Sequence, residues 1–297
     1  MSIEAKLTAE AQRLGFAAIG IARADASQTL AFFQAWLDGH NAAGMDWLQR
    51  HMELRADPRV LAPGIQSVIM TAARYPVHPT PGEGFSYYAR GRDYHDVLRQ
   101  NLEAFAKWLA HEAGAKIARI CVDSAPLFER EWALRAGIGW RGKQGQVIHP
   151  QHGACIFLGA LLTDTILEPS TPMAAQCGTC RKCVDACPSG AINEQGCVDA
   201  RKCLSYLTIE HQGEIPASLQ QAMGKTLFGC DRCTAVCPFN PPNAGAIMDA
   251  FQPQPMPDAA ECLAMDAKTF KARFAGTAVL RSGLARIQRN ARIAMQN

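Results

Sequence analysis

The stretch that decides how this chain is organised is Cys177-Gly-Thr-Cys180-Arg-Lys-Cys183-Val-Asp-Ala-Cys187-Pro188. It has the form C-x₂-C-x₂-C-x₃-C-P, a spacing with which proteins hold iron–sulfur clusters. Three thiolates placed three residues apart on a tight loop can occupy three corners of one [4Fe–4S] cube. In chains that hold two cubes, the fourth cysteine of such a run ligates the other cube. The run therefore predicts a second group of ligands elsewhere in the chain.

A second group of cysteines follows closer to the C-terminus, with one isolated cysteine between the two groups. Dividing the ligands three plus one predicts cluster 1 on Cys177, Cys180, Cys183 and Cys237, and cluster 2 on Cys187, Cys203, Cys230 and Cys233. The alternative is a pair of zinc sites, but zinc favours C-x₂-C pairs separated by a spacer, which this run fits poorly. We interpret the remaining four as ordinary buried thiols: Cys121, Cys155, Cys197 and Cys262.

The composition is that of a globular protein. The chain has 297 residues, of which 48% are apolar and 19% charged, enough to bury a sizeable core. Its first residues, MSIEAKLTAEAQRLGF, include acidic side chains and no long apolar run, so they predict neither a secretion signal nor a membrane span. We expect a cytoplasmic protein with reduced cysteines. A net charge of +3 permits a nucleic-acid partner without proving one.

Alternating helix and strand patterns up to about residue 165 indicate an α/β or α+β domain. Helices are expected over residues 3–14, 30–38, 97–112 and 128–136, and strands over residues 16–21, 67–73, 116–121 and 155–162. We assign the fold class as α+β. The expected units are an α/β-like N-terminal catalytic domain (1–168), a ferredoxin-like two-cluster module (169–245) and a C-terminal helical segment (246–297).

Two features of the N-terminal domain indicate reacting groups. The Pro- and Gly-rich run YPVHPTPGEGFSYYARGRDYH is expected to be a loop of about twenty residues without regular structure, and loops of that length are commonly functional. Asp123 follows directly after the strand expected over 116–121, where α/β enzymes place reacting carboxylates. The competing interpretation of Asp123 is a helix N-cap.

The last patterned segment, RSGLARIQRNARIAMQN, predicts an amphipathic helix. Its apolar stripe consists of Leu280, Leu284, Ile287 and Ala291, and the opposite side carries Arg281, Arg286, Arg289 and Arg292. This arginine face is either an ordinary solvated surface or a contact for an RNA backbone.

The N-terminal domain argues for an enzyme, because an electron carrier does not need such a domain ahead of its clusters. We find no G-x-G-x-x-G after the first strand and no P-loop, so nicotinamide and ATP are poorly supported. The Gly-rich run GIGWRGKQG is not placed as a dinucleotide-binding fingerprint would be. Electrons that pass through two clusters still need a terminal acceptor, so we expect a further cofactor.

Several motifs, in order along the chain, resemble the epoxyqueuosine reductase family, cobalamin-dependent enzymes that complete queuosine synthesis in tRNA. They are ADPRVLAPG, YARGRDYH, VDSAP, ER-x-WA, GW-x-GK, FLG-x-LLT, CGTCRKCVDACPSGAI, RKCLSYLTIE, LFGCDRCTAVCPFN and RNARIA. The resemblance implies a base-off cobalamin between the N-terminal domain and the cluster module, with electrons reaching it through two [4Fe–4S] clusters. It implies that epoxyqueuosine at the wobble position of a tRNA anticodon is reduced to queuosine, with loss of water.

The resemblance also implies roles for single residues. Asp123 falls on the family's general acid, which protonates the departing epoxide oxygen, and burial beside the apolar corrin would raise its pKa. Asp93, Tyr94 and His95 match a pocket motif, in which the Asp–His pair would orient or buffer proton delivery and Tyr94 would stack on the flipped base. Position alone suggests contacts with the corrin or its tail from Ser205, Tyr206, Thr208 and Asp231, and Asp123 is expected to contact the cobalamin as well.

Three departures from the family pattern are expected around the catalytic pocket and leave a different substrate open. They are Ala125 within VDSAP, where the family usually has VDTGP; Gln144, where it has asparagine; and Cys155, near which it has an aromatic residue. The alternatives are a cobalamin-dependent reductive dehalogenase-like enzyme acting on a small molecule, a ferredoxin-type electron carrier and a zinc-stabilised RNA-binding module. The expected partners are tRNA carrying epoxyqueuosine and an external low-potential electron donor, for a monomer that does not bind membranes.

Overall fold

A four-stranded sheet forms the centre of the N-terminal part in the computed structural model, which describes residues 2–241 and 247–297. The strand order is β1-β2-β7-β4, and every neighbouring pair in this sheet is antiparallel. The expected α+β class is confirmed, but the parallel pairing of an α/β-like domain is absent from this sheet. Asp123 therefore follows an antiparallel edge strand, and not a strand of a parallel sheet.

The helices and strands expected in the N-terminal part are all present, with ends that differ from the expected ones by at most three residues. The elements are α1 (Ile3–Arg13), β1 (Ala18–Arg23), α2 (Leu30–Asp38), η1 (Asp46–Gln49), α3 (Met52–Ala56), α4 (Pro58–Leu61), β2 (Ser67–Arg74), β3 (Gly84–Phe85), η2 (Tyr87–Ala89), α5 (Tyr94–Ala113), β4 (Ala118–Cys121), α6 (Glu129–Arg135), β5 (Trp140–Arg141), β6 (Val147–Ile148) and β7 (Ile156–Thr163).

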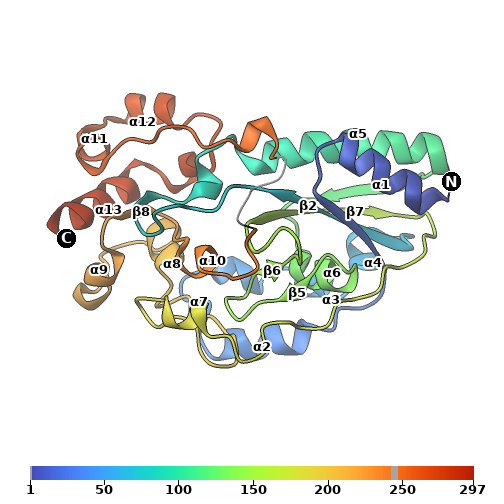
Figure 1. Cartoon of the computed structure of the whole chain (residues 1–297), viewed down its shortest axis with the longest axis horizontal. Coiled ribbons are helices and arrows are strands. Elements are labelled where there is room, and N and C mark those ends of the chain that lie inside the picture. Colours follow the sequence, from blue (N-terminus) through green and yellow to red (C-terminus); the bar gives the residue numbers. More distant parts are fainter. Residues whose placement is uncertain (1, 242–246) are drawn as a thin grey trace.

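Helices cover both faces of the sheet, which explains why β2 is buried along its whole length. On one face, Ile69 of β2 belongs to a core with Leu7 of α1 and Phe105 of α5. On the other face, Val68 of the same strand packs in a core with Trp132 of α6. Figure 1 shows α1 and α5 on one side of β2 and β7, and α6 on the other.

The loop expected over residues 75–95 contains regular structure, so that expectation is wrong. β3 pairs in parallel with β8 (Thr226–Phe228) of the cluster module, and η2 follows it. Phe85 of β3 packs against Phe228 and Phe274. This pairing ties the N-terminal part to the module and gives the loop a fixed path toward α5. The unit boundary expected at 245/246 lies outside the described residues.

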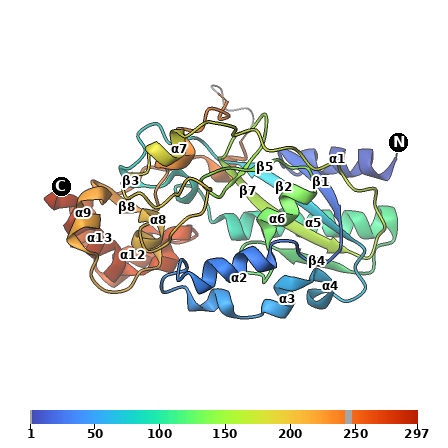
Figure 2. The ribbon, with the colours of Figure 1, turned by 90° about the horizontal axis from the view of Figure 1, so that it is seen from below.

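The cluster module consists of short helices joined by irregular chain, at the end of the molecule that also holds the C-terminal helices (Figures 1 and 2). Its elements and those of the C-terminal segment are α7 (Lys182–Asp185), α8 (Leu204–Ile209), α9 (Ala217–Met223), β8, α10 (Arg232–Ala235), η3 (Asp249–Phe251), α11 (Ala259–Ala264), α12 (Ala267–Arg273), η4 (Ala278–Ser282) and α13 (Leu284–Gln296). Among the described residues, no helix combines the length and the apolar character needed to cross a membrane.

Two arginines of α13 bind backbone carbonyls of the cluster module. The sequence had suggested either a solvated surface or an RNA contact for them. Arg289 donates hydrogen bonds to the carbonyls of Leu207, His211 and Gly213, at 2.6, 2.9 and 2.8 Å. Arg286 donates to the carbonyl of Ile209 at 2.7 Å. These side chains satisfy carbonyls at and just beyond the end of α8, where a helix leaves its last carbonyls without internal partners.

The other two arginines of the expected face, Arg281 and Arg292, do not bind these carbonyls. Arg281 forms an ion pair with Glu210 at 2.6 Å, and Arg292 is exposed. Next to Arg289, the fully buried Asn290 donates to the carbonyls of Thr208 and Leu227, at 2.9 and 2.8 Å. Helix α13 therefore fastens α8 and β8 through polar contacts as well as through Ile287 and Ala291 of its apolar stripe. The expected single helix is wrong at its start, because Leu280 and Arg281 lie in η4, before α13, and Leu280 is exposed.

Candidate active site and cluster module

One histidine joins two carboxylates at the start of α5. Asp93 is the N-cap of this helix, and its side chain accepts a hydrogen bond from the backbone N–H of His95 at 3.0 Å. The ring Nδ1 of His95 lies 2.7 Å from Asp93 Oδ1, and its Nε2 lies 3.1 Å from Asp123 Oδ2. The cap explains why the helix begins at Tyr94, three residues before its expected start. We call Asp93, His95 and Asp123 the proton group.

Asp123 reaches His95 from a turn with left-handed backbone. Its φ is +55°, a conformation that costs energy for a residue with a side chain and that recurs at functional sites. The following helix, α6, begins only at Glu129 and has Phe128 as its N-cap residue, so Asp123 does not cap it. The N-cap interpretation is therefore wrong. The Asp123 side chain is 53% exposed, which leaves part of its carboxylate open to a ligand.

Hydrogen bonding within the proton group decides which residue carries the proton. Burial disfavours the charged form of His95, but its hydrogen bonds with Asp123 and Asp93 outweigh burial and raise its pKa to about 9. The hydrogen bond from His95 lowers the pKa of Asp123 against the effect of burial. Burial likewise opposes the charge of Asp93, but hydrogen bonds from His95 lower its pKa. Within the protein alone the proton at neutral pH therefore lies on His95, between two carboxylates. A rise in the pKa of Asp123 caused by the corrin stays a prediction.

Tyr94 packs behind the proton group. Its ring stacks on His95 with a centroid distance of 4.1 Å, and on Phe157 of β7 at 4.6 Å and an interplanar angle of 8°. Burial raises the pKa of its hydroxyl, and the nearby Asp123 carboxylate adds to this. The arrangement fixes the plane of the His95 ring, whereas stacking of Tyr94 on a substrate base stays a prediction.

Besides Asp123, four residues were expected at the corrin, and three of these four already have partners within the protein. The Tyr206 hydroxyl accepts from the backbone N–H of Gly44 at 2.9 Å, and Thr208 Oγ1 accepts from the N–H of Gly229 at 2.9 Å. The buried Asp231 accepts from the N–H of Tyr87 at 2.8 Å, which holds η2 against the cluster module. Ser205 is half-buried at the first turn of α8. The cofactor roles of all four stay predictions.

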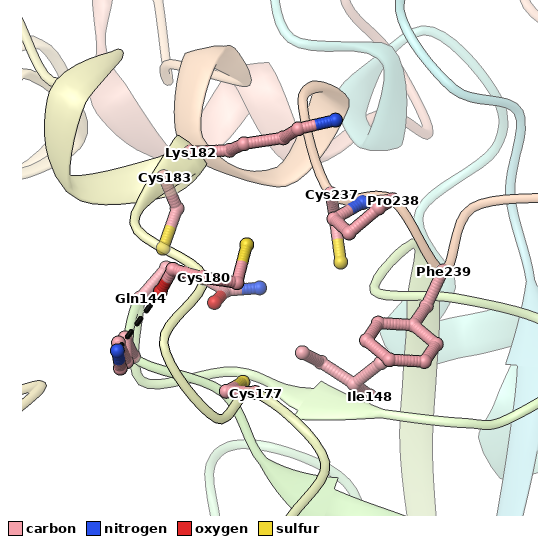
Figure 3. Close-up of a pocket in the computed structure, with 10 residues that line it drawn as sticks. Gln144, Ile148, Cys177, Cys180, Lys182, Cys183, Cys237, Pro238 and Phe239 are labelled. Atoms are coloured by element: carbon pink, nitrogen blue, oxygen red, sulfur yellow. Dashed lines mark hydrogen bonds between the residues drawn. The ribbon is translucent and has the colours of Figure 1, made fainter.

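The structure gathers each predicted set of cluster cysteines. The sulfur atoms of the first set, Cys177, Cys180, Cys183 and Cys237, turn toward a common hollow (Figure 3). In the second set, burial raises the pKa of Cys233, and the neighbouring thiols of Cys230, Cys203 and Cys187 raise it further. All twelve cysteines are free of disulfides. Cys197 is half-exposed, so the expectation of a buried thiol is wrong there.

A zinc site gains no support from this geometry. Within residues 2–241 and 247–297, no three His, Cys, Asp or Glu side chains are placed to hold a single metal ion. A single zinc ion would need its sulfur ligands within about 2.3 Å of one point, whereas a cubane cluster spreads its four thiolates around a larger body.

Gln144, one of the departures noted in the sequence, lines the cluster 1 hollow together with Lys143. Both residues come from the turn between β5 and β6. The sequence signal was the run GIGWRGKQG, whose glycines indicated a tight turn but not what the turn would touch. Cys155, a second departure, is buried, and its carbonyl accepts from the N–H of Tyr75.

Comparison with known proteins gives these two regions a common context. Residues 55–124 match the family model described as "Epoxyqueuosine reductase QueG, DUF1730", and residues 176–240 match "4Fe-4S double cluster binding domain". An epoxyqueuosine reductase of Vibrio cholerae is 39% identical over 297 residues, an alignment that covers 96% of this chain and 80% of the relative. The chain belongs to the epoxyqueuosine reductase family.

Solved structures of epoxyqueuosine reductases share the fold along nearly the whole chain. One, a crystal structure with an epoxyqueuosine-modified tRNA-Tyr stem loop, has a TM-score of 0.91 at 29% identity and covers 99% of this chain and 80% of its own. A second, from Bacillus subtilis, has a TM-score of 0.89 at 30% identity, with coverage of 99% and 81%. That structure is described as having its catalytic aspartate loop swung out of the active site. The proton group and the double-cluster segment therefore both lie within the family's common architecture.

Proposed function

We propose that this chain is an epoxyqueuosine reductase, which converts epoxyqueuosine in a tRNA anticodon to queuosine. The reaction takes up two electrons and two protons, removes the epoxide oxygen as water and leaves an alkene. The observation that carries the proposal is the co-occurrence, in one family fold, of a proton group and a double-cluster segment. A plain electron carrier would have no use for a histidine held between two carboxylates.

Proton delivery would involve His95 and Asp123 together. An alkoxide is a poor leaving group, and a positioned acid contributes typically about 10²–10⁴-fold to such a step. Asp123 is the open end of the proton group, because its side chain is 53% exposed whereas that of His95 is 23% exposed. His95 would supply the proton through Nε2, and Asp123 would pass it to the departing oxygen. Asp93 would hold the ring in place through Nδ1, and Tyr94 would support its plane.

One buried histidine fits a cofactor whose edge carries amide groups, as the corrin of cobalamin does. His78 is 4% exposed, and its Nε2 has no hydrogen-bond partner within the described residues. Its ring lies beside Tyr87, whose N–H is bound by Asp231. His78 therefore has a ring nitrogen available for a polar group of the cofactor, and Ser205 stays a predicted contact. When bound, cobalamin would supply the strongly reducing centre that accepts electrons from the clusters.

Most of the arginines expected to contact tRNA have partners within the protein. Arg286 and Arg289 are occupied by carbonyls of the cluster module, and Arg281 is paired with Glu210. Of the four arginines on that face, the exposed Arg292 remains for a phosphate contact. An external low-potential electron donor, a monomeric state and a cytoplasmic location stay predictions.

The test is a reaction with the fully loaded protein. It is reconstituted anaerobically with iron, sulfide and cobalamin, supplied with a strong reductant, and given tRNA that carries epoxyqueuosine. Nucleoside analysis should then show queuosine. If cobalamin is bound and reduced but no queuosine is formed, the substrate assignment is wrong.

A further inference from the structure

The turn between β5 and β6, residues 142–146, is the part of the Gly-rich run that the proposed reaction does not use. The N–H of Gly142 donates to the carbonyl of Gln146 at 2.8 Å, and the N–H of Gly145 donates to the carbonyl of Gly142 at 2.9 Å. Gly145 has a φ of +81°, which glycine adopts without strain. This tight turn fixes the directions of the two residues at its tip, Lys143 and Gln144.

Lys143 fastens the turn to the first cysteine loop. Its Nζ donates to the carbonyl of Gly178 at 2.9 Å and to that of Cys180 at 2.8 Å. These carbonyls belong to the loop that carries the first cluster 1 cysteines. The neighbouring Gln144 is therefore held at a fixed position relative to those cysteines.

Gln144 places an unsatisfied donor at the hollow of cluster 1. The residue is 5% exposed, and its Nε2 is buried without a hydrogen-bond partner among the described residues. A buried polar group left without a partner costs about 1–3 kcal/mol, so such a group calls for a partner, which can be a ligand, an ion or a water molecule. Gln144 lines the same hollow as the four cluster 1 cysteines, and Figure 3 shows it among them.

The space beside Gln144 is shaped for its amide. A Cβ added at Gly142 would lie 2.5 Å from Gln144 Oε1 and 2.6 Å from Ile148 Cδ1, both closer than van der Waals contact permits. Glycine at position 142 thus lets the amide lie close to the turn. An amide NH₂ only donates, and the sulfur atoms of an iron–sulfur cluster carry negative charge and accept.

We propose that Gln144 donates a hydrogen bond from Nε2 to a sulfur atom of cluster 1 and so raises the reduction potential of that cluster. A donor near the sulfurs stabilises the added electron, and hydrogen bonds to sulfur are among the factors that set the potential of such clusters. Gln144 would act as a tuning residue on cluster 1 and leave cluster 2 unaffected. The inference requires the double cluster but not the proposed substrate.

The test is an EPR-monitored redox titration of the reconstituted holoprotein without tRNA. Gln144→Leu keeps the size of the side chain and removes the donor, so the reduction equilibrium of cluster 1 should fall by about tenfold, which is about 59 mV for one electron. Gln144→Asn keeps an amide donor but is one methylene shorter, so the potential of cluster 1 should lie between those of Gln144→Leu and the wild type. The matched control is Ile148→Val, which alters the same hollow without touching a donor and should leave both potentials unchanged. Loss of one signal in Cys237→Ser identifies cluster 1.

A second measurement decides the question if Gln144→Leu does not retain its cluster. Pulsed EPR on the reduced wild-type protein, labelled with ¹⁵N in the glutamine side chains, should show a ¹⁵N coupling to cluster 1. Absence of this coupling would overturn the proposal, as would an unchanged cluster 1 potential in an intact Gln144→Leu protein or equal shifts of both clusters. Because no measurement involves tRNA, failure here is distinct from failure of the proposed reaction.

Discussion

The proton group and the cluster module are built in opposite ways. The proton group comes from the ends of two regular elements, α5 and β4, and needs one contact between residues 28 positions apart. The cluster module has little regular structure and is held by side chains from distant segments: Lys143 binds the first cysteine loop, and Arg289 binds the end of α8. We therefore expect changes in the proton group to reduce turnover without loss of metal, and changes around the module to reduce stability or alter the clusters.

The largest effect is expected at Asp123. Asp123→Ala removes the open end of the proton group, and turnover should fall by about 10²–10⁴-fold, the usual contribution of a positioned acid. Iron content and cobalamin binding should stay near the wild-type values, because Asp123 bonds to His95 and not to a cysteine loop, and it caps no helix. Full queuosine formation by this variant would end the proposed role of Asp123.

The next effect is the pH dependence of turnover. The pKa of His95 is raised to about 9, so His95 keeps its proton at neutral pH and loses it as the pH rises through that value. Under saturating tRNA and reductant, the rate should be flat below this pKa and fall about tenfold per pH unit above it. His95→Gln keeps a side chain that can hydrogen-bond but cannot carry the proton. If the rate of this variant still falls above pH 9 as in the wild type, His95 is not the group that carries the proton.

A smaller effect is expected where α13 fastens the module. Asn290→Ala leaves the buried carbonyls of Thr208 and Leu227 without their donor, at a cost of about 1–3 kcal/mol for each group. The free energy of unfolding, measured with denaturant on the reconstituted protein, should fall accordingly.

The smallest effect is expected at the exposed Arg292 on the same helix. Arg292→Ala is the matched control for Asn290→Ala, and its stability should stay within about 0.5 kcal/mol of wild type. Equal loss of stability in the two variants would show that α13 does not fasten the module through Asn290.

The same comparison explains what the sequence could predict. The cluster ligands could be predicted because three cysteines spaced three apart constrain one loop directly, without knowledge of the rest of the fold. Helix and strand positions followed from apolar periodicity and from glycines at their ends. The antiparallel pairing of the sheet was missed, because alternating elements alone do not fix strand direction.

Contacts between distant segments could not be predicted, although their residues stood out. Asp93, His95 and Asp123 were each candidates. Their contact depends on the path of the chain after β4, which requires a positive φ at Asp123, and the sequence does not reveal this conformation. The arginines of α13 suggested solvent or RNA, since charge patterns do not reveal carbonyls that lack partners on another helix. Gln144 was noted only as a departure, because its neighbourhood depends on how the β5–β6 turn meets the cysteine loop.

The central claim is that the proton at this site lies on His95, between Asp93 and Asp123, at neutral pH. It is tested most directly by ¹⁵N NMR of the histidine rings in the folded holoprotein, with the clusters oxidised and His95→Gln used to assign the signal. The account predicts that both ring nitrogens of His95 are protonated at pH 7 and that the ring titrates with a pKa of about 9. A His95 ring that is neutral at pH 7, with a pKa at or below the ordinary value of about 6.5, would contradict it.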